Sequence, residues 1–138
     1  MRKVFAGLAI ALALTLVAQF YLAASGAFDP APADESFGSH RALGYGIILF
    51  AVLLTIAAPL ARMPGRLIGM TALIAGLGVA QVLIRLLADA VDDSGGTGTD
   101  AGRLVFGLHA INGLIMLALA ASVAWRGSAL ARRPEAAS

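Results

Sequence analysis

Four apolar segments, each long enough to cross a lipid bilayer, take up most of this chain of 138 residues. A hydrocarbon core about 30 Å thick needs roughly 20 apolar residues per helix. The chain is 59% hydrophobic with a mean hydropathy of +0.87, which predicts an all-α transmembrane bundle rather than a soluble domain. The predicted membrane-spanning helices are 4–24, 38–61, 67–88 and 104–125.

Turn-forming and polar residues separate these helices within a single membrane domain. The predicted connections are outer loops 25–37 and 89–103, an inner turn 62–66 and a tail 126–138. Ser36 and the acidic residues before it are expected to cap the second helix. The glycine-rich string 95–98 is predicted to be a linker, because it lacks the Lys-Ser/Thr pair of a phosphate-binding loop.

Charged residues gather at opposite ends of the predicted helices and so predict the topology. If four helices alternate, one end carries the basic residues Arg2, Lys3, Arg62, Arg66, Arg126, Arg132 and Arg133. The other end carries Asp29, Asp34, Glu35, Asp89, Asp92, Asp93 and Asp100. Basic residues favour the cytoplasmic side, so we expect a multi-pass protein of the inner (plasma) membrane with both termini in the cytoplasm. The net charge of +2 lies at membrane edges, and no nucleic-acid partner is expected.

The chain contains no cysteine, which excludes disulfides, thiolate-bound metals, iron–sulfur clusters and covalently attached haem. Ser25-Gly26-Ala27 is a small-residue sequence of the kind found at signal-peptide cleavage sites. The apolar run before it is longer than a signal peptide usually has. We therefore expect the first helix to remain in the protein.

A repeated motif contains both histidines of the chain. Phe37–Gly44 reads F-G-S-H-R-A-L-G, and Phe106–Gly113 reads F-G-L-H-A-I-N-G. Upstream of each copy lies a second, shorter repeat, V-A-Q-F-Y-L at Val17–Leu22 and V-A-Q-V-L-I at Val79–Ile84. The pattern predicts two parallel helical-hairpin repeats related by a pseudo-twofold axis along the membrane normal, with the histidines facing each other.

Depth counting puts the two histidines near the same membrane boundary. At 1.5 Å per residue, His40 lies about 33 Å and His109 about 26 Å from the inner-edge arginines. Gly44 and Gly113 follow four residues later on the same helix faces and would leave room for a flat ligand. We therefore predict one b-type haem between the second and fourth helices, with both imidazoles as axial ligands, an arrangement that favours electron transfer.

Further polar residues near this level are predicted to complete the cofactor site. They are Gln19, Arg41, Gln81, Arg85, Arg103 and Asn112. The arginines are candidate partners of the haem propionates, and Arg85 is a charge inside an otherwise apolar span. The glutamines are candidates for orienting an imidazole or binding a quinone head group. Asn112 stands where the first motif has a leucine.

A structural role explains the same residues equally well. Histidine and glutamine side chains can join helices through hydrogen bonds worth ~0.6 kcal/mol each, and Arg85 can pair with Asp89 one turn away. The chain is then a non-catalytic subunit or scaffold, or a protein that binds quinone or lipid. A metal site is a further alternative, although no acid lies near either histidine in sequence. Small residues at Ala72, Gly76 and Ala80 predict a face for close helix packing, in the bundle or in a homodimer.

The stretch Ser39–Gly44, together with a second histidine at the outer start of the fourth helix, resembles one four-helix half of haem A synthase and other four-helix membrane cytochromes b. The resemblance implies that His40 and His109 ligate haem. Haem A synthase has two such halves and this chain has one, so we expect an electron-transfer or accessory protein rather than a complete enzyme. The chain is also similar to a family of small four-helix bacterial integral membrane proteins with no assigned activity, which carry H-R and H-A-x-N-G at these places.

Overall fold

The structure, a computed structural model, describes residues 1–91 and 99–132. Its helices are α1 (Arg2–Ala27), α2 (Ala33–Ser36), α3 (Gly38–Leu60), α4 (Gly65–Val91) and α5 (Asp100–Ala131). The predicted linker at 95–98 and the last residues of the predicted tail lie outside the described residues. The described chain is otherwise helices joined by short turns, which confirms the predicted all-α fold.

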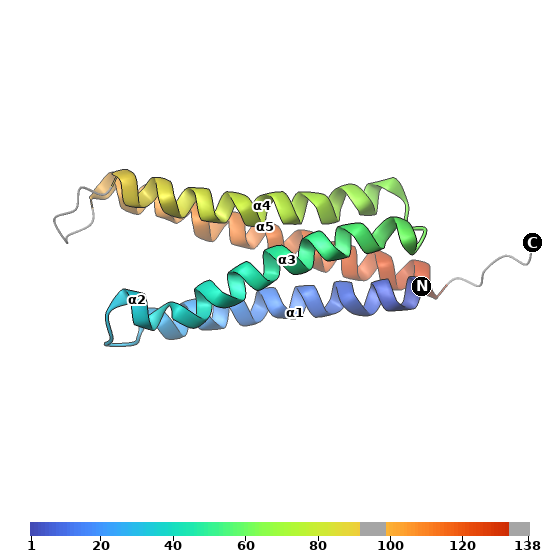
Figure 1. Cartoon of the computed structure of the whole chain (residues 1–138), viewed down its shortest axis with the longest axis horizontal. Coiled ribbons are helices and arrows are strands. Elements are labelled where there is room, and N and C mark those ends of the chain that lie inside the picture. Colours follow the sequence, from blue (N-terminus) through green and yellow to red (C-terminus); the bar gives the residue numbers. More distant parts are fainter. Residues whose placement is uncertain (92–98, 133–138) are drawn as a thin grey trace, which may run out of the picture.

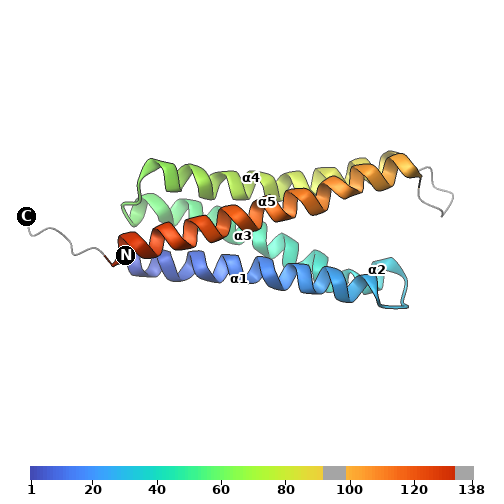
Figure 2. The same cartoon turned by 180° about the vertical axis from the view of Figure 1, so that it is seen from behind.

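The four long helices form an antiparallel bundle in which each has two neighbours (Figure 1). α1 packs beside α3 and α5, and α4 packs beside the same two helices, so α3 and α5 are diagonal to each other. The start of α1 and the end of α5 lie at one end of the bundle, here the terminal end, and α2 lies at the other, the α2 end (Figure 2). Towards the α2 end, the α1–α3 pair and the α4–α5 pair diverge in both views.

Most helices extend beyond the apolar segments that predicted them. α5 begins at Asp100 and ends at Ala131, whereas the apolar run suggested 104–125. Its start is fixed by Thr99, whose Oγ1 accepts a hydrogen bond of 3.0 Å from the Gly102 amide. The expected cap at Ser36 was wrong: Ser36 belongs to α2, and Phe37 precedes α3 without a side-chain cap bond.

The outward surface of the bundle is apolar, as lipid contact requires. All four long helices are long and apolar enough to cross a membrane, and only 22% to 28% of the residues in their most apolar windows are buried. Large side chains such as Leu14 and Trp125 are 64% and 68% exposed. In water such a surface would drive association, so the chain is a multi-pass membrane protein.

The buried core fills the middle and the terminal end of the bundle. Its largest fully buried side chains are Phe5, Leu12, Leu54, Thr71, Ile74 and Val123. The Thr71 hydroxyl donates to the Ile68 carbonyl at 2.8 Å, so its polar group is satisfied within α4. Apolar packing is therefore concentrated away from the α2 end, where the helix pairs diverge.

Close helix packing uses a different glycine from the one the sequence suggested. A Cβ added to Gly78 would lie 2.8 Å from Cγ1 of Ile48, so this glycine lets α3 approach α4. Gly76, in the predicted small-residue face, is exposed, and a Cβ there would meet nothing within 4 Å. The face of Ala72, Gly76 and Ala80 was therefore wrong as a contact within the chain, and its role in a homodimer stays a prediction.

We expect Gly78→Ala to lower the free energy of unfolding by about 1–3 kcal/mol, because the new methyl overpacks the contact with Ile48. The matched control, Gly76→Ala, should raise the free energy of unfolding by up to about 1 kcal/mol, because alanine favours helix. Unfolding in mixed detergent measures both. A loss of stability in Gly76→Ala would contradict the packing described here.

The turn between α3 and α4 places an arginine where helices usually end in glycine. Arg62 has φ 52, in the left-handed region. The Arg62 amide donates to the Pro59 carbonyl at 2.9 Å, and the Met63 amide donates to the Ala58 carbonyl at 3.0 Å. This is the Schellman pattern of hydrogen bonds, and it folds Met63 back into the core, where it is 5% exposed.

Replacing Arg62 by glycine should raise the free energy of unfolding by about 1 kcal/mol, because glycine adopts this conformation without steric cost. Arg66→Gly, in the first turn of α4, should lower it by up to about 1 kcal/mol, because glycine disfavours helix. Detergent unfolding should thus give effects of opposite sign. Two effects of the same sign would argue against conformational strain at Arg62.

Candidate functional site

Each long helix contributes one histidine or glutamine to a polar cluster near the α2 end of the bundle. Gln19 comes from α1, His40 from α3, Gln81 from α4 and His109 from α5. All four are partly buried. They lie between otherwise apolar helices, where a polar group without a partner costs free energy.

Gln19 and His40 join α1 to α3 through three contacts. Nδ1 of His40 lies 3.2 Å from the carbonyl oxygen of Gln19, and the amide nitrogen Nε2 of Gln19 donates to the His40 carbonyl at 2.9 Å. The same Gln19 nitrogen lies 3.3 Å from Nε2 of His40. With Nδ1–H donating to the carbonyl, Nε2 carries the lone pair.

Gly44 provides the space for this glutamine. A Cβ added to Gly44 would lie 3.1 Å from Nε2 of Gln19. The predicted open face beside His40 is thus occupied by the amide of Gln19. A ligand that used this face would have to displace that flexible side chain.

The second hairpin repeats the arrangement. A Cβ added to Gly113 would lie 3.3 Å from Nε2 of Gln81 and 3.3 Å from the Phe20 ring. His109 differs from His40 in one respect, because its Nδ1 has no hydrogen-bond partner in the described residues, whereas Nδ1 of His40 lies 3.2 Å from the Gln19 carbonyl oxygen. The repeated sequence therefore corresponds to a repeated arrangement in space, with one glutamine, one histidine and one glycine in each hairpin.

The two histidines meet across the diagonal of the bundle. Their ring centres are 6.2 Å apart and their planes are inclined by 47°. The backbones of α3 and α5 do not pack against each other in the described residues. The two histidine side chains therefore reach across the space between these helices. The imidazole pair therefore brings the two diagonal helices into side-chain contact at this level.

A phenylalanine contacts each imidazole from three residues earlier in the chain, Phe37 at the start of α3 and Phe106 within α5. Phe37 meets His40 edge to face, with ring centres 6.1 Å apart. Phe106 stacks on His109 at 5.3 Å and 15°. Sequence reasoning assigned no role to these residues or to Phe20, although the first position of the F-G-x-H motif, three residues before histidine, was the available signal.

Three buried polar atoms of the cluster lack a hydrogen-bond partner in the described residues. They are Oε1 of Gln19, Oε1 of Gln81 and Nδ1 of His109. Most buried side-chain polar atoms in folded proteins are satisfied. These atoms are therefore available to a ligand, a water molecule or a metal-bound group.

The other predicted site residues have protein partners. Asn112 is buried, and its Nδ2 donates to the Leu77 carbonyl at 2.9 Å, which joins α5 to α4. Each predicted propionate partner is paired with an acid: Arg85 with Asp89, Arg41 with Asp34 and Arg103 with Asp100. Arg85 also contacts the phenylalanine that stacks on His109, with its guanidinium 6.0 Å from the Phe106 ring centre.

The donor set limits what the cluster can bind. Among the described residues, no group of three or more histidine, cysteine, aspartate or glutamate side chains is arranged to hold a metal ion. A protein-ligated zinc site usually needs three or four such donors. The two imidazoles suit a metal that arrives with most of its ligands already attached.

Comparison with known proteins identifies a family and no assigned activity. A family of unknown function, DUF6220, matches residues 19–88, a range that starts at Gln19, includes His40 and Gln81 and ends before His109. No curated protein and no solved structure matches the chain. Nothing in these comparisons relates the chain to haem A synthase or to a cytochrome b. Since the matched range covers just over half of the residues, the chain belongs to the family of unknown function DUF6220.

Proposed function

We propose that this protein is a small b-type cytochrome that binds one haem near the α2 end, with His40 and His109 as axial ligands. The observation that carries the proposal is the 6.2 Å separation of the two ring centres. Two imidazoles bound on opposite sides of one metal ion, each through a bond of about 2 Å, have ring centres roughly 6 Å apart. A small rotation of the two rings would therefore allow both imidazoles to bind one iron.

The surroundings of the histidines support the same proposal. A ligating imidazole usually donates its other N–H to a carbonyl or carboxylate, and Nδ1 of His40 already faces the Gln19 carbonyl. Iron in a porphyrin needs only two axial ligands from the protein, which is what the cluster offers. Haem entry would displace the amides of Gln19 and Gln81 from Gly44 and Gly113, and the divergence of the helix pairs at this end favours that movement.

The charge distribution supports a position near the outer face of the plasma membrane. The arginines of the α2 end are each paired with an acid, whereas the basic residues of the terminal end have no ion pair in the described chain. Uncompensated basic residues favour the cytoplasm, so the termini would be inside. The bound group would supply one-electron transfer between a membrane carrier such as a quinone and a partner at the outer face.

The proposal predicts a low-spin b-type spectrum from protein purified in detergent after expression with added haem. Both His40→Ala and His109→Ala should abolish the reduced-minus-oxidised difference signal, because each removes one axial ligand. Circular dichroism should show that both variants remain helical. Ser122→Ala, on an exposed hydroxyl that bonds only within α5, is a control that should retain the signal.

A spectrum without haem, from wild-type protein that is folded and haem-replete, would reject the cytochrome. Retention of the full signal by either histidine variant would reject that residue as a ligand.

A second candidate is a non-catalytic membrane subunit in which the polar cluster locks the helices together. The specific observations in its favour are the contacts of Gln19 with His40 and the hydrogen bond of Asn112 to Leu77. In lipid such contacts specify which helix faces meet, although each contributes modestly to stability.

If the polar cluster stabilises helix packing, a double-mutant cycle of Gln19→Ala and His40→Ala should give a coupling energy of about 0.6 kcal/mol, and at most ~2 kcal/mol, in detergent unfolding. The control cycle, Gln19→Ala combined with Ser122→Ala in a different part of the bundle, should give no coupling energy. Absence of coupling between Gln19 and His40 would show that their contacts do not stabilise the bundle.

A further inference from the structure

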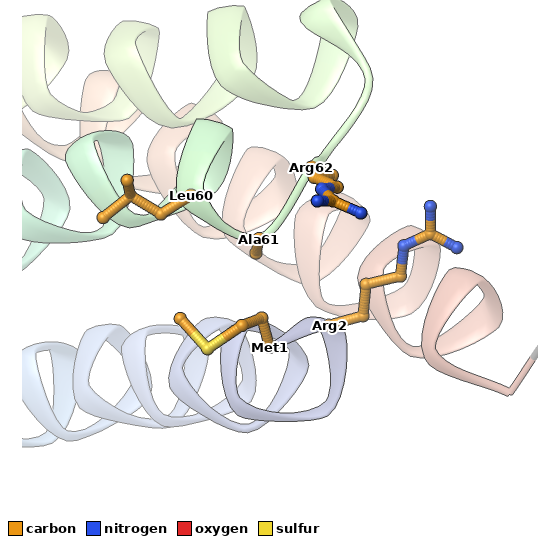
Figure 3. A pocket seen from close by; sticks show the side chains of 5 residues that line it. All are labelled: Met1, Arg2, Leu60, Ala61 and Arg62. Carbon is orange, nitrogen blue, oxygen red and sulfur yellow. The ribbon is translucent and has the colours of Figure 1, made fainter. Parts of the chain in front are cut away.

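A pocket at the terminal end has both apolar residues and two arginines in its lining, and the arginines form its rim. It has a volume of about 190 Å³, lies where the start of α1 meets the end of α3, and is lined by Met1, Arg2, Leu60, Ala61 and Arg62. Figure 3 shows the side chains of Met1 and Leu60 on one side of the pocket and those of Arg2 and Arg62 on the other. Met1 and Leu60 are 76% and 66% exposed, so both apolar side chains lie on the outer surface of the bundle.

The two arginines of this rim have no acidic partner. In residues 1–91 and 99–132, the acidic side chains all belong to the α2 end, and neither Arg2 nor Arg62 makes an ion pair or a side-chain hydrogen bond there. α1 also begins here without an acidic residue in its first turn, so the positive end of its dipole adds to the same potential. Within the described residues, the rim therefore carries positive charge without an acidic partner, beside exposed apolar side chains.

Conformation at Arg62 gives an independent reason to assign it a ligand. Glycine fits the left-handed position that ends α3, yet the chain has an arginine there, with φ 52. The strained residue directs a cation to the pocket rim. Strain held at one residue is often a sign that its side chain has a function.

We propose that this pocket binds the head group of an anionic phospholipid. The phosphate would lie between the guanidinium groups of Arg2 and Arg62, which bind phosphate oxygens through paired N–H groups. An acyl chain would run along Met1 and Leu60 into the bilayer. A basic pocket between membrane helices next to an apolar surface matches both halves of such a lipid. The proposal is independent of haem binding.

The test is native mass spectrometry of the full chain in detergent with added phosphatidylglycerol, using phosphatidylcholine with the same acyl chains as the neutral probe. We expect bound phosphatidylglycerol to fall about fivefold in Arg2→Gln and in Arg62→Gln. Arg62→Gly should lose the lipid to the same extent while keeping the turn. Arg66→Gln, which removes a basic residue from the same end but outside the pocket, should change binding less than twofold.

Each other result would overturn the proposal. Equal binding of the two lipids would remove the preference for an anion, and an equal loss in Arg66→Gln and Arg62→Gln would show general surface attraction. Full competition by millimolar inorganic phosphate would show a site for the free anion rather than for lipid. Unfolding measurements on all four variants separate lost binding from lost structure.

Discussion

The hydrocarbon interior of a bilayer offers no hydrogen bonds, and this constraint determines where polar side chains lie in the bundle. Gln19, His40 and Asn112 find partners across helix boundaries, while Thr71 bonds within its own helix. The two glutamine amides fit over glycines of the neighbouring helices. The histidine pair and its glutamines therefore belong to the packing of the bundle as well as to any site, which is why haem binding and helix locking compete for the same residues.

The four long helices follow from the lengths of the apolar runs, because a bilayer fixes the length of a spanning helix, whereas the order in which they pack is a finding of the structure. Helix ends were less predictable, since α5 continues beyond its apolar run at both ends. The glycine that makes the close helix contact was also not predictable. Gly76 and Gly78 lie in the same run of α4, and only the three-dimensional packing against Ile48 shows that Gly78 makes the contact. A sequence period identifies a face, but the neighbouring helix determines whether that face is buried.

In the candidate site, the repeat correctly indicated that His40 and His109 face each other, because duplicated hairpins repeat their geometry as well as their residues. The contents of the space beside each glycine could not be predicted, because side-chain placement depends on the neighbouring helix. Gln19 and Gln81 precede their glycines by 25 and 32 residues in sequence, and no local pattern connects them. The phenylalanines were predictable in principle, since each lies one helical turn from its histidine.

The two ends of the molecule differ in how their arginines are compensated, and this difference connects topology with ligand binding. At the α2 end, Arg41, Arg85 and Arg103 are neutralised by acids close in sequence, which removes much of their attraction for anions and weakens their assignment to propionates. At the terminal end, Arg2 and Arg62 have no such partner in the part of the chain that the structure describes. Positive charge that favours the cytoplasmic side during insertion is thereby left free to bind anionic lipid afterwards. An arginine in a strained turn is easier to explain by that second role than by the first, because topology requires only a charge near the membrane edge, whereas a binding site requires it at one position.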